Sequence, residues 1–469
     1  MTERKVRIAT LSVVGVTLAA AMLALESSGT RADVPDPVVE GPIPYSVGTY
    51  GFPFSSVPDL ADLAALGYTE QEFIFSGTVL TPTGPQPYRS RMIVRRPTDP
   101  KRFNGTVVIE WLNVTAGADI SVDWGLTRHQ VVRDGYAYVG VSAQPVGICW
   151  LKSWDSVRYG ELTHPALLPG PCPATNQTET YSYDIFSQAG KAARDNPLIL
   201  NGLEVRQLLA VGASQSARRL INYINDFHQT AQIYDGFLIH VIGGGGGGLI
   251  TDTSKKVLIL NSENEVLGHY PYRGLQPANV RYWEVAGVGH SPELSYTKTQ
   301  LAHSGITLLY NCDYPASDDF IPMYPVGDAA LDALNRWVSD GTPPPDSPLV
   351  KVIPGTPNTI ARDQYGNALG GIRLPQIEVP IGRFIGTNTP TGFLICRTSG
   401  GFDLFDGQPA GMTLNDIWNE PTLDQMYANH GSYVSAFVQA VDNIVSAGFM
   451  LGADAQIAKA EAAHSDIRK

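Results

Sequence analysis

One stretch of the chain decides the fold: Leu208-Leu209-Ala210-Val211-Gly212-Ala213-Ser214-Gln215-Ser216-Ala217. Its first four residues are apolar and predict a buried strand, and a helical pattern begins directly after the Gly-x-Ser-x-Ser that follows. This strand–turn–helix order is typical of a nucleophile elbow. Strand and helix approach closely at such a turn, so the residues two positions away must be small, as Gly212 and Ser216 are. The stretch predicts Ser214 as a nucleophile, although a serine before a helix can also serve only as its N-cap.

An elbow serine needs an acid and a base that follow it in the chain. Two carboxylates, Glu263 and Glu265, come directly after one predicted strand, and a glycine-containing loop after the next strand carries His290. These positions lie at the carboxyl edge of a parallel sheet, where α/β proteins form their sites. We therefore predict His290 as the general base, with His303 as its nearest rival. We expect Glu265 to be the acid because it lies farther from the strand end, and Glu263 is the alternative.

The tetrahedral intermediate of acyl transfer needs two hydrogen-bond donors for its oxyanion. We expect one to be the backbone amide of Gln215, the residue after the nucleophile. The other is expected from Asn113 or Val114, in the turn-like loop after the predicted strand Thr106–Leu112. The same loop can also be an ordinary turn in which the Asn113 side chain bonds its own backbone.

Strand-like apolar runs alternate with helical patterns through most of the chain. Continuous apolar runs suit a parallel sheet that is buried on both faces, and the alternation predicts a doubly wound α/β fold. The expected strands are 71–79, 88–95, 106–112, 136–141, 206–211, 236–242, 256–260 and 281–285. The expected helices are 123–134, 185–195, 216–227, 329–339 and 434–447.

We expect one domain over residues 33–469, interrupted by long insertions. Residues 143–182 are rich in Pro, Gly and Cys and are predicted to form an irregular, cap-like loop over the sheet. A second cap-like insertion is expected at about 291–325. The C-terminal extension, at about 350–469, fits either an appended subdomain or a part of the same core.

Residues 1–32 predict a secretory signal: basic residues precede an uncharged apolar run of 18 residues, and small and polar residues follow. An uncleaved membrane anchor is the alternative. The chain has four cysteines, an even number that permits two disulfides in an exported protein. We favour Cys149–Cys172, then Cys312–Cys396. We therefore expect a secreted or periplasmic protein with no stable membrane association once the signal is cleaved.

The composition narrows the classes of partner. Apolar residues make up 43% and charged residues 17% of the chain, which supplies a large core and excludes a disordered protein. The net charge of −12 repels phosphate backbones, so no nucleic-acid partner is expected. The cysteines lack metal-ligand spacing, and no metal or organic cofactor is implied. A small-molecule substrate is the expected partner, and the sequence does not specify an oligomeric state.

Four stretches together resemble a family of bacterial exported alpha/beta-hydrolase-domain proteins, mostly described as serine esterases: Asn104–Val114, Gly212–Ala217, Trp283–Gly287 and Ala361–Arg373. The likeness runs from about Leu60 to about Ala455. It implies the α/β-hydrolase fold, a mostly parallel doubly wound sheet, and it supports Ser214 and His290 as catalytic residues. The family's acid loop has the pattern Ser-Glu-x-Asp, where this chain has glutamate at position 265.

The predicted triad and the resemblance lead to one expected activity. We expect a serine hydrolase that cleaves carboxylic esters through an acyl-enzyme on Ser214. Amidase, lactonase or acyltransferase activity uses the same triad, because a triad does not choose the leaving group or the acceptor. A non-catalytic binding protein on the same fold is the alternative from another class.

Overall fold

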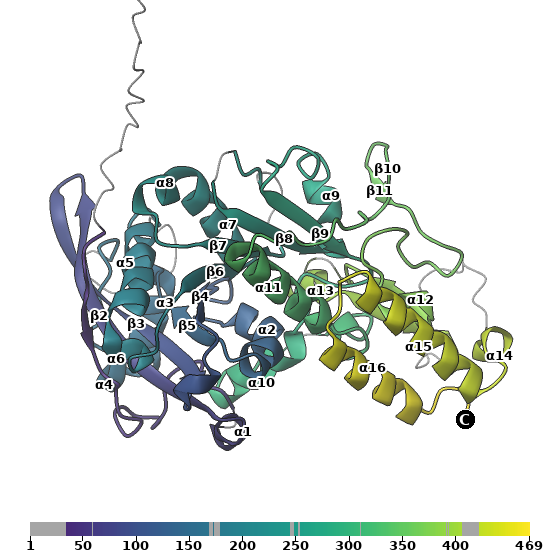
Figure 1. Ribbon diagram of the computed structural model, residues 1–469, viewed down its shortest axis with the longest axis horizontal. Helices are drawn as coiled ribbons and strands as arrows, with labels where there is room; N and C mark the ends of the chain where they lie inside the picture. Colours follow the sequence, from purple (N-terminus) through teal and green to yellow (C-terminus); the bar gives the residue numbers. More distant parts are fainter. Residues whose placement is uncertain are drawn as a thin grey trace, which may run out of the picture.

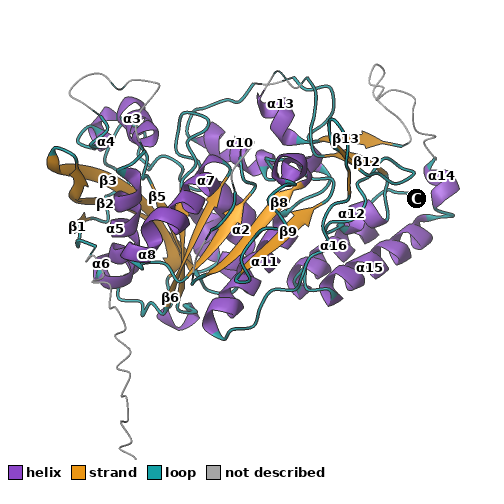
Figure 2. Ribbon diagram, turned by 90° about the horizontal axis from the view of Figure 1, so that it is seen from above, coloured by secondary structure: helices purple, strands orange, loops and turns teal. Residues whose placement is uncertain are grey.

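A sheet of nine strands lies at the centre of the protein, in the order β1-β2-β3-β5-β4-β6-β7-β8-β9 (Figure 2). The computed structural model describes residues 34–469 except 59, 168–171, 173–178, 244–247, 252–253, 310, 391, 393 and 406–421. The predicted signal at 1–32 lies outside the described residues. The strands are β1 (Val38–Glu40), β2 (Tyr68–Thr81), β3 (Gly84–Pro97), β4 (Thr106–Trp111), β5 (Ala137–Val141), β6 (Gln207–Ala213), β7 (Gly236–His240), β8 (Lys256–Ser262) and β9 (Val280–Val285).

The sheet is parallel from β5 to β9 and antiparallel at the edge that β1, β2 and β3 form. Strands β2 and β3 are joined by two residues only, and such a short connection forces antiparallel pairing. Every residue of β4, β5, β6 and β7 is buried, as the continuous apolar runs predicted. The predicted mostly parallel α/β sheet is confirmed.

Helices cover both faces of the sheet (Figures 1 and 2). Alternate residues of one strand pack on opposite sides: Leu209 joins the core that contains α2 (Val122–Arg133) and α11 (Tyr324–Ser339), whereas Leu208 joins the core that contains α5 (Ser182–Asp195). The first helix after β6, α7 (Gln215–Asn222), packs on the same side as α5. The sheet is therefore doubly wound.

The remaining helices and strands are short connecting elements or belong to the insertions and the extension. The helices are α1 (Leu60–Ala65), α3 (Pro145–Trp154), α4 (Ser156–Tyr159), α6 (Pro197–Leu200), α8 (His228–Ala231), α9 (Val266–His269), α10 (Leu294–His303), α12 (Pro375–Glu378), α13 (Leu394–Ser399), α14 (Leu423–Met426), α15 (His430–Ser446) and α16 (Gly452–His464). A π-helical segment, Tyr223–Phe227, continues α7, and 3-10 turns lie at Pro100–Arg102, Glu263–Glu265 and Ser317–Asp319. Two small hairpins consist of β10 (Val352–Ile353) with β11 (Thr359–Ile360) and of β12 (Gly382–Ile385) with β13 (Gly401–Leu404).

The described part of the insertion 143–182 is more regular than predicted, because α3 and α4 lie in it. Ile148 and Leu151 of α3 are buried in one cluster with Phe54, which comes from a segment almost a hundred residues earlier. The Cys149–Cys172 disulfide joins α3 to the far side of the insertion. Because these stabilising contacts are tertiary, the local composition of the insertion did not indicate its helices.

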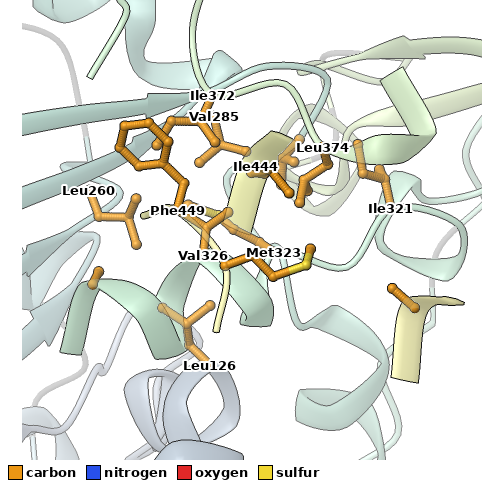
Figure 3. Close-up of a cluster of buried hydrophobic side chains, with 14 of the residues drawn as sticks. Leu126, Leu260, Val285, Ile321, Met323, Val326, Ile372, Leu374, Ile444 and Phe449 are labelled. Carbon is orange, nitrogen blue, oxygen red and sulfur yellow. The ribbon is translucent and has the colours of Figure 1, made fainter. Parts of the chain in front are cut away.

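The C-terminal extension shares the main hydrophobic core. Ile444 and Phe449 from the extension lie in one cluster with Val285 of β9 and Leu126 of α2 (Figure 3). The Phe449 ring meets the buried Trp283 ring edge-on, with 4.9 Å between centroids. The extension is therefore part of the same core rather than an appended subdomain.

The structure contains both of the disulfides that we favoured, Cys149–Cys172 and Cys312–Cys396. The second joins a loop after α10 to helix α13, across 84 residues of sequence. Among the described residues, no helix is long and apolar enough to cross a membrane.

Phe449→Ala tests the shared core. Removing a buried aromatic ring leaves a cavity, so we expect the free energy of unfolding to fall by about 3–5 kcal/mol, measured by urea denaturation. This loss of stability should appear in the same unfolding transition in which the central sheet unfolds. The control Leu309→Ala removes a side chain that is 89% exposed and should change stability by less than about 0.5 kcal/mol. A separate early transition for the extension would contradict a shared core.

Candidate active site

Ser214 lies on the turn between β6 and α7, in a strained backbone conformation. Its φ is 59° and its ψ is −114°, an uncommon left-handed φ for a residue other than glycine. Gly212 has little room for a side chain, since a Cβ there would lie 3.0 Å from Leu220 and 3.2 Å from the Ser216 backbone. Ser214 makes no side-chain capping hydrogen bond to the helix. The N-cap alternative therefore does not describe this serine.

The three predicted catalytic side chains form a continuous chain of hydrogen bonds. His290 Nε2 lies 2.7 Å from Ser214 Oγ, and His290 Nδ1 lies 2.6 Å from Glu265 Oε1. The other oxygen of Glu265 accepts hydrogen bonds from the backbone amide and the hydroxyl of Ser262, at 2.9 and 2.6 Å. This arrangement holds the imidazole with one nitrogen toward the carboxylate and the other toward the serine.

Glu265 is buried yet has a lowered pKa. Burial alone would raise the pKa of this carboxyl, but the charge and hydrogen bond of His290 and the two hydrogen bonds from Ser262 favour the ionised form more strongly. The carboxylate therefore stays charged at neutral pH, as a group that orients and stabilises an imidazolium must.

Glu263, the alternative acid, does not contact the imidazole. Its carboxylate accepts a hydrogen bond from the Gly287 amide at 2.7 Å and forms an ion pair with Arg362 at 2.7 Å. Its Oε1 also accepts the Gly386 amide at 3.2 Å. Glu263 thus joins the acid loop, the histidine loop and the C-terminal extension, and its position is structural.

The other candidate base lies elsewhere. The His303 ring stacks on Phe52, with 4.5 Å between ring centroids, and the residue ends α10. It does not line the cavity that contains Ser214. Of the predicted bases, the structure brings only His290 to the serine hydroxyl.

The expected oxyanion donors differ in the hydrogen bonds that their amide groups already make within the protein. The Gln215 amide is at the first position of α7, whose first turn leaves its amides without helical acceptors. The Asn113 amide donates to the Ile120 carbonyl at 3.0 Å, and its side-chain amide donates to the Ala213 carbonyl at 2.9 Å. Both amide groups of Asn113 therefore already bind the protein itself. Val114 stays the predicted backbone donor from this loop, and it does not line the cavity that contains Ser214.

A cavity of about 910 Å³ opens over the serine, a size in the range of small-molecule sites. Ser214, Gln215, Glu265 and His290 all line it. The rest of its wall is largely apolar and comes from the start of α2 and the loop before it, from α10 and the loop after it, and from α13: Ile120, Val122, Leu294, Leu308, Leu394 and Ile395. Among the described residues, no group of three or more His, Cys, Asp or Glu side chains could hold a metal ion.

A family model described as "Alpha/beta hydrolase domain" matches residues 39–460, which is most of the chain. The chain belongs to this family. No curated protein has a sequence that matches it.

Solved structures are similar to about half of this alpha/beta hydrolase domain. An alpha-beta serine hydrolase homologue from Coxiella burnetii is 9% identical, covers 49% of this chain and 95% of its own, and has a TM-score of 0.31. Esterase Est22 is 12% identical over 53% of this chain and 82% of its own, with a TM-score of 0.33. An arylesterase is 11% identical over 49% of this chain and 82% of its own, with a TM-score of 0.30. These identities and TM-scores are low, so the assignment of the chain to its family rests on the family model alone.

Sequence reasoning missed a second buried polar group in this hydrolase domain, directly behind the elbow. Asp123 Oδ1 lies 3.0 Å from His240 Nδ1, and the His240 carbonyl accepts the Ser214 amide at 2.9 Å. Glu110 accepts hydrogen bonds from the Asp123 amide and from the Tyr138 hydroxyl, at 3.0 and 2.7 Å. A glutamate inside the apolar run 106–112 was the one signal in the sequence that could have indicated this group.

Burial controls the ionisation of this cluster. Desolvation raises the pKa of Glu110 well above its usual value, and the neighbouring charge of Asp123 adds to the shift. Desolvation raises the pKa of Asp123 as well, and it lowers the pKa of His240 to about 3. The cluster therefore holds at least one proton on its two carboxyls at neutral pH, while the imidazole stays uncharged.

This proton produces a pH dependence of stability. Carboxyls with raised pKa bind more protons in the folded state than in the unfolded state, so the contribution of this pair to folding stability should fall as the pH rises from about 5 to 9. Asp123→Asn cannot ionise, and we expect its free energy of unfolding to fall over this range by about 1–2 kcal/mol less than that of the wild type. Urea denaturation at several pH values measures the difference.

Asp346→Asn is the matched control, because its carboxylate is 95% exposed and should leave the pH profile as it is. Parallel profiles for the wild type and Asp123→Asn would show that the buried carboxyls are ionised in the folded protein.

Proposed function

We propose that this protein is a carboxylic ester hydrolase that acts through an acyl-enzyme on Ser214. One observation carries the proposal: the hydrogen-bonded series from Glu265 through His290 to the Ser214 hydroxyl, at 2.6 and 2.7 Å. Membership of the alpha/beta hydrolase domain family and the largely apolar cavity over the serine support it.

The geometry supports a two-step acyl transfer. His290 Nε2 takes the proton as the Ser214 oxygen forms a bond to the ester carbonyl carbon, and the charge of Glu265 stabilises the imidazolium. The amides of Gln215 and Val114 would hold the oxyanion. Collapse breaks the bond to the alkoxide, which receives the proton from His290. Water then attacks the acyl-enzyme by the same route, and the acid and Ser214 are released.

We propose that the enzyme works outside the cytoplasm, secreted or periplasmic. The two disulfides support this location, because disulfides persist in oxidising compartments. The first fastens the insertion after β5, and the second fastens helix α13 at the wall of the cavity. The substrate is proposed to be a small ester that fits the cavity.

Ser214→Ala tests the nucleophile. Without the hydroxyl no acyl-enzyme forms, so we expect kcat for 4-nitrophenyl esters to fall by at least about 10⁴-fold with the fold intact. The variant should also fail to bind a fluorophosphonate probe covalently, as intact-protein mass spectrometry would show. The control Ser153→Ala changes an exposed serine whose hydroxyl bonds the Trp150 carbonyl, and it should react like the wild type. Hydrolysis by Ser214→Ala at the wild-type rate would refute the proposal.

A pair of substitutions assigns the acid. Glu265→Gln removes the charge that faces the imidazole, so we expect kcat to fall by about 10²- to 10⁴-fold with little change in the melting temperature. Glu263→Gln breaks a buried ion pair with Arg362 instead, and it should lower the melting temperature more than kcat. The reverse pattern in these two measurements would make Glu263 the acid.

A further inference from the structure

The cavity over Ser214 carries positive charge beside its apolar wall. Arg218 and Arg397 both line it. Two carboxylates line it as well, and each is already engaged: Glu265 binds His290, and Glu293 lies 3.6 Å from Arg128 outside the lining. Burial also raises the pKa of Glu293 to about 8, which favours its uncharged form. Arg397 therefore brings a positive charge to the cavity wall, in a chain whose net charge is −12.

Arg218 and Arg397 differ in the contacts that their side chains make. Arg218 lies one turn after Ser214 on α7, and its Nε donates to the Gly243 carbonyl, so its guanidinium already supports the loop after β7. Arg397 is exposed, and within the described part of the chain its guanidinium has no carboxylate partner. Arg397 is thus the residue that can give its full set of donors to a ligand, while Arg218 adds positive charge nearby.

Helix α13 holds Arg397 in a fixed place relative to the triad. The Arg397 carbonyl accepts the side-chain amide of Asn264, next to the acid Glu265, at 2.9 Å. The Thr398 carbonyl accepts the amide of Ser291, next to His290, at 2.8 Å. The Cys312–Cys396 disulfide secures the same turn. A guanidinium on this helix is therefore placed with the acid loop and the histidine loop as one unit.

We propose that the natural substrate is an ester whose apolar body carries a carboxylate, and that Arg397 binds this carboxylate. The inference rests on the proposed ester hydrolase function. A planar guanidinium matches a carboxylate with two parallel hydrogen bonds. The apolar side chains of α10 and α13 would cover the body of the substrate, so Arg397 determines specificity rather than chemistry.

The test compares esters with the same leaving group and the same reacting carbonyl. 4-Nitrophenyl hexanoate is neutral, and the mono-4-nitrophenyl ester of adipic acid adds a terminal carboxylate to a chain of the same length. The corresponding mono-4-nitrophenyl esters of glutaric and pimelic acid place the carboxylate one methylene closer to the reacting carbonyl and one methylene farther from it. The quantity measured is the ratio of kcat/KM for the best anionic ester to kcat/KM for the hexanoate.

We expect Arg397→Gln to lower this ratio about tenfold and Arg397→Lys to lower it by less, because lysine retains the charge but not the planar pair of donors. Arg336→Gln, on the exposed side of α11 and paired with Asp332, is the matched control and should leave the ratio unchanged. A ratio that Arg397→Gln does not change would overturn the inference, while continued hydrolysis of the hexanoate would leave the proposed function intact.

A second measurement does not depend on where the ester bond lies. Competitive inhibition of hexanoate hydrolysis by 4-phenylbutyrate and by 4-phenylbutanol compares one apolar body with and without a carboxylate. We expect the carboxylate to inhibit about tenfold more strongly in the wild type, and Arg397→Gln to remove the difference. Equal inhibition by the two compounds in the wild type would overturn the inference. Failure to hydrolyse any ester, with no fluorophosphonate labelling of Ser214, would instead refute the proposed function and this inference with it.

Discussion

The register of four parallel strands is the constraint on which the site depends. Ala213 of β6 pairs with His240 of β7, His240 with Leu260 of β8, and Leu260 with Trp283 of β9. Ser214 directly follows the end of β6. The loop that carries Glu265 follows the end of β8, and the loop that carries His290 follows the end of β9. Because side chains alternate along a strand, a slip of one residue would move β6 by about 3.3 Å and turn its side chains to the other face. The distances of 2.6 and 2.7 Å in the triad require this alignment.

The C-terminal extension binds the loops that follow β8 and β9. A loop that leaves a strand end is not rigid in itself, and here the extension contacts both the loop of Glu265 and the loop of His290. Glu263 binds Arg362 of the extension and the Gly287 amide of the histidine loop. A side chain at Gly289 would collide with the backbone of Gly400, so the histidine loop and the end of α13 meet backbone to backbone. The bond between Arg362 and Glu263 brings the stretch Ala361–Arg373, which carries part of the family resemblance, next to the loop of the acid.

The site is built at a cost to stability. The left-handed φ of Ser214 costs on the order of 1–3 kcal/mol, and the polar cluster behind it adds the cost of burying Asp123 and His240 with one atom each unbonded among the described residues. The large core that the sheet shares with α2, α11 and the extension offsets these costs. The strained turn exposes the nucleophile, and His240 accepts the Ser214 amide, so the unfavourable features lie where the proposed chemistry takes place.

The sequence by itself indicated the strands β2 to β9, the elbow, Ser214 and His290 as its partner, and the short loop from which the acid comes. Each depends on local signals: apolar runs of strand length, small residues around Ser214, and the chain order of serine, acid and histidine. Only the tertiary structure decided between Glu265 and Glu263, because both lie in one short loop and the choice is a direction in space. It also decided that residues 143–182 contain helices and that the extension belongs to the main core. The polar cluster of Glu110, Asp123 and His240 could not be found locally, since its members come from different elements that meet only when the sheet and α2 pack together.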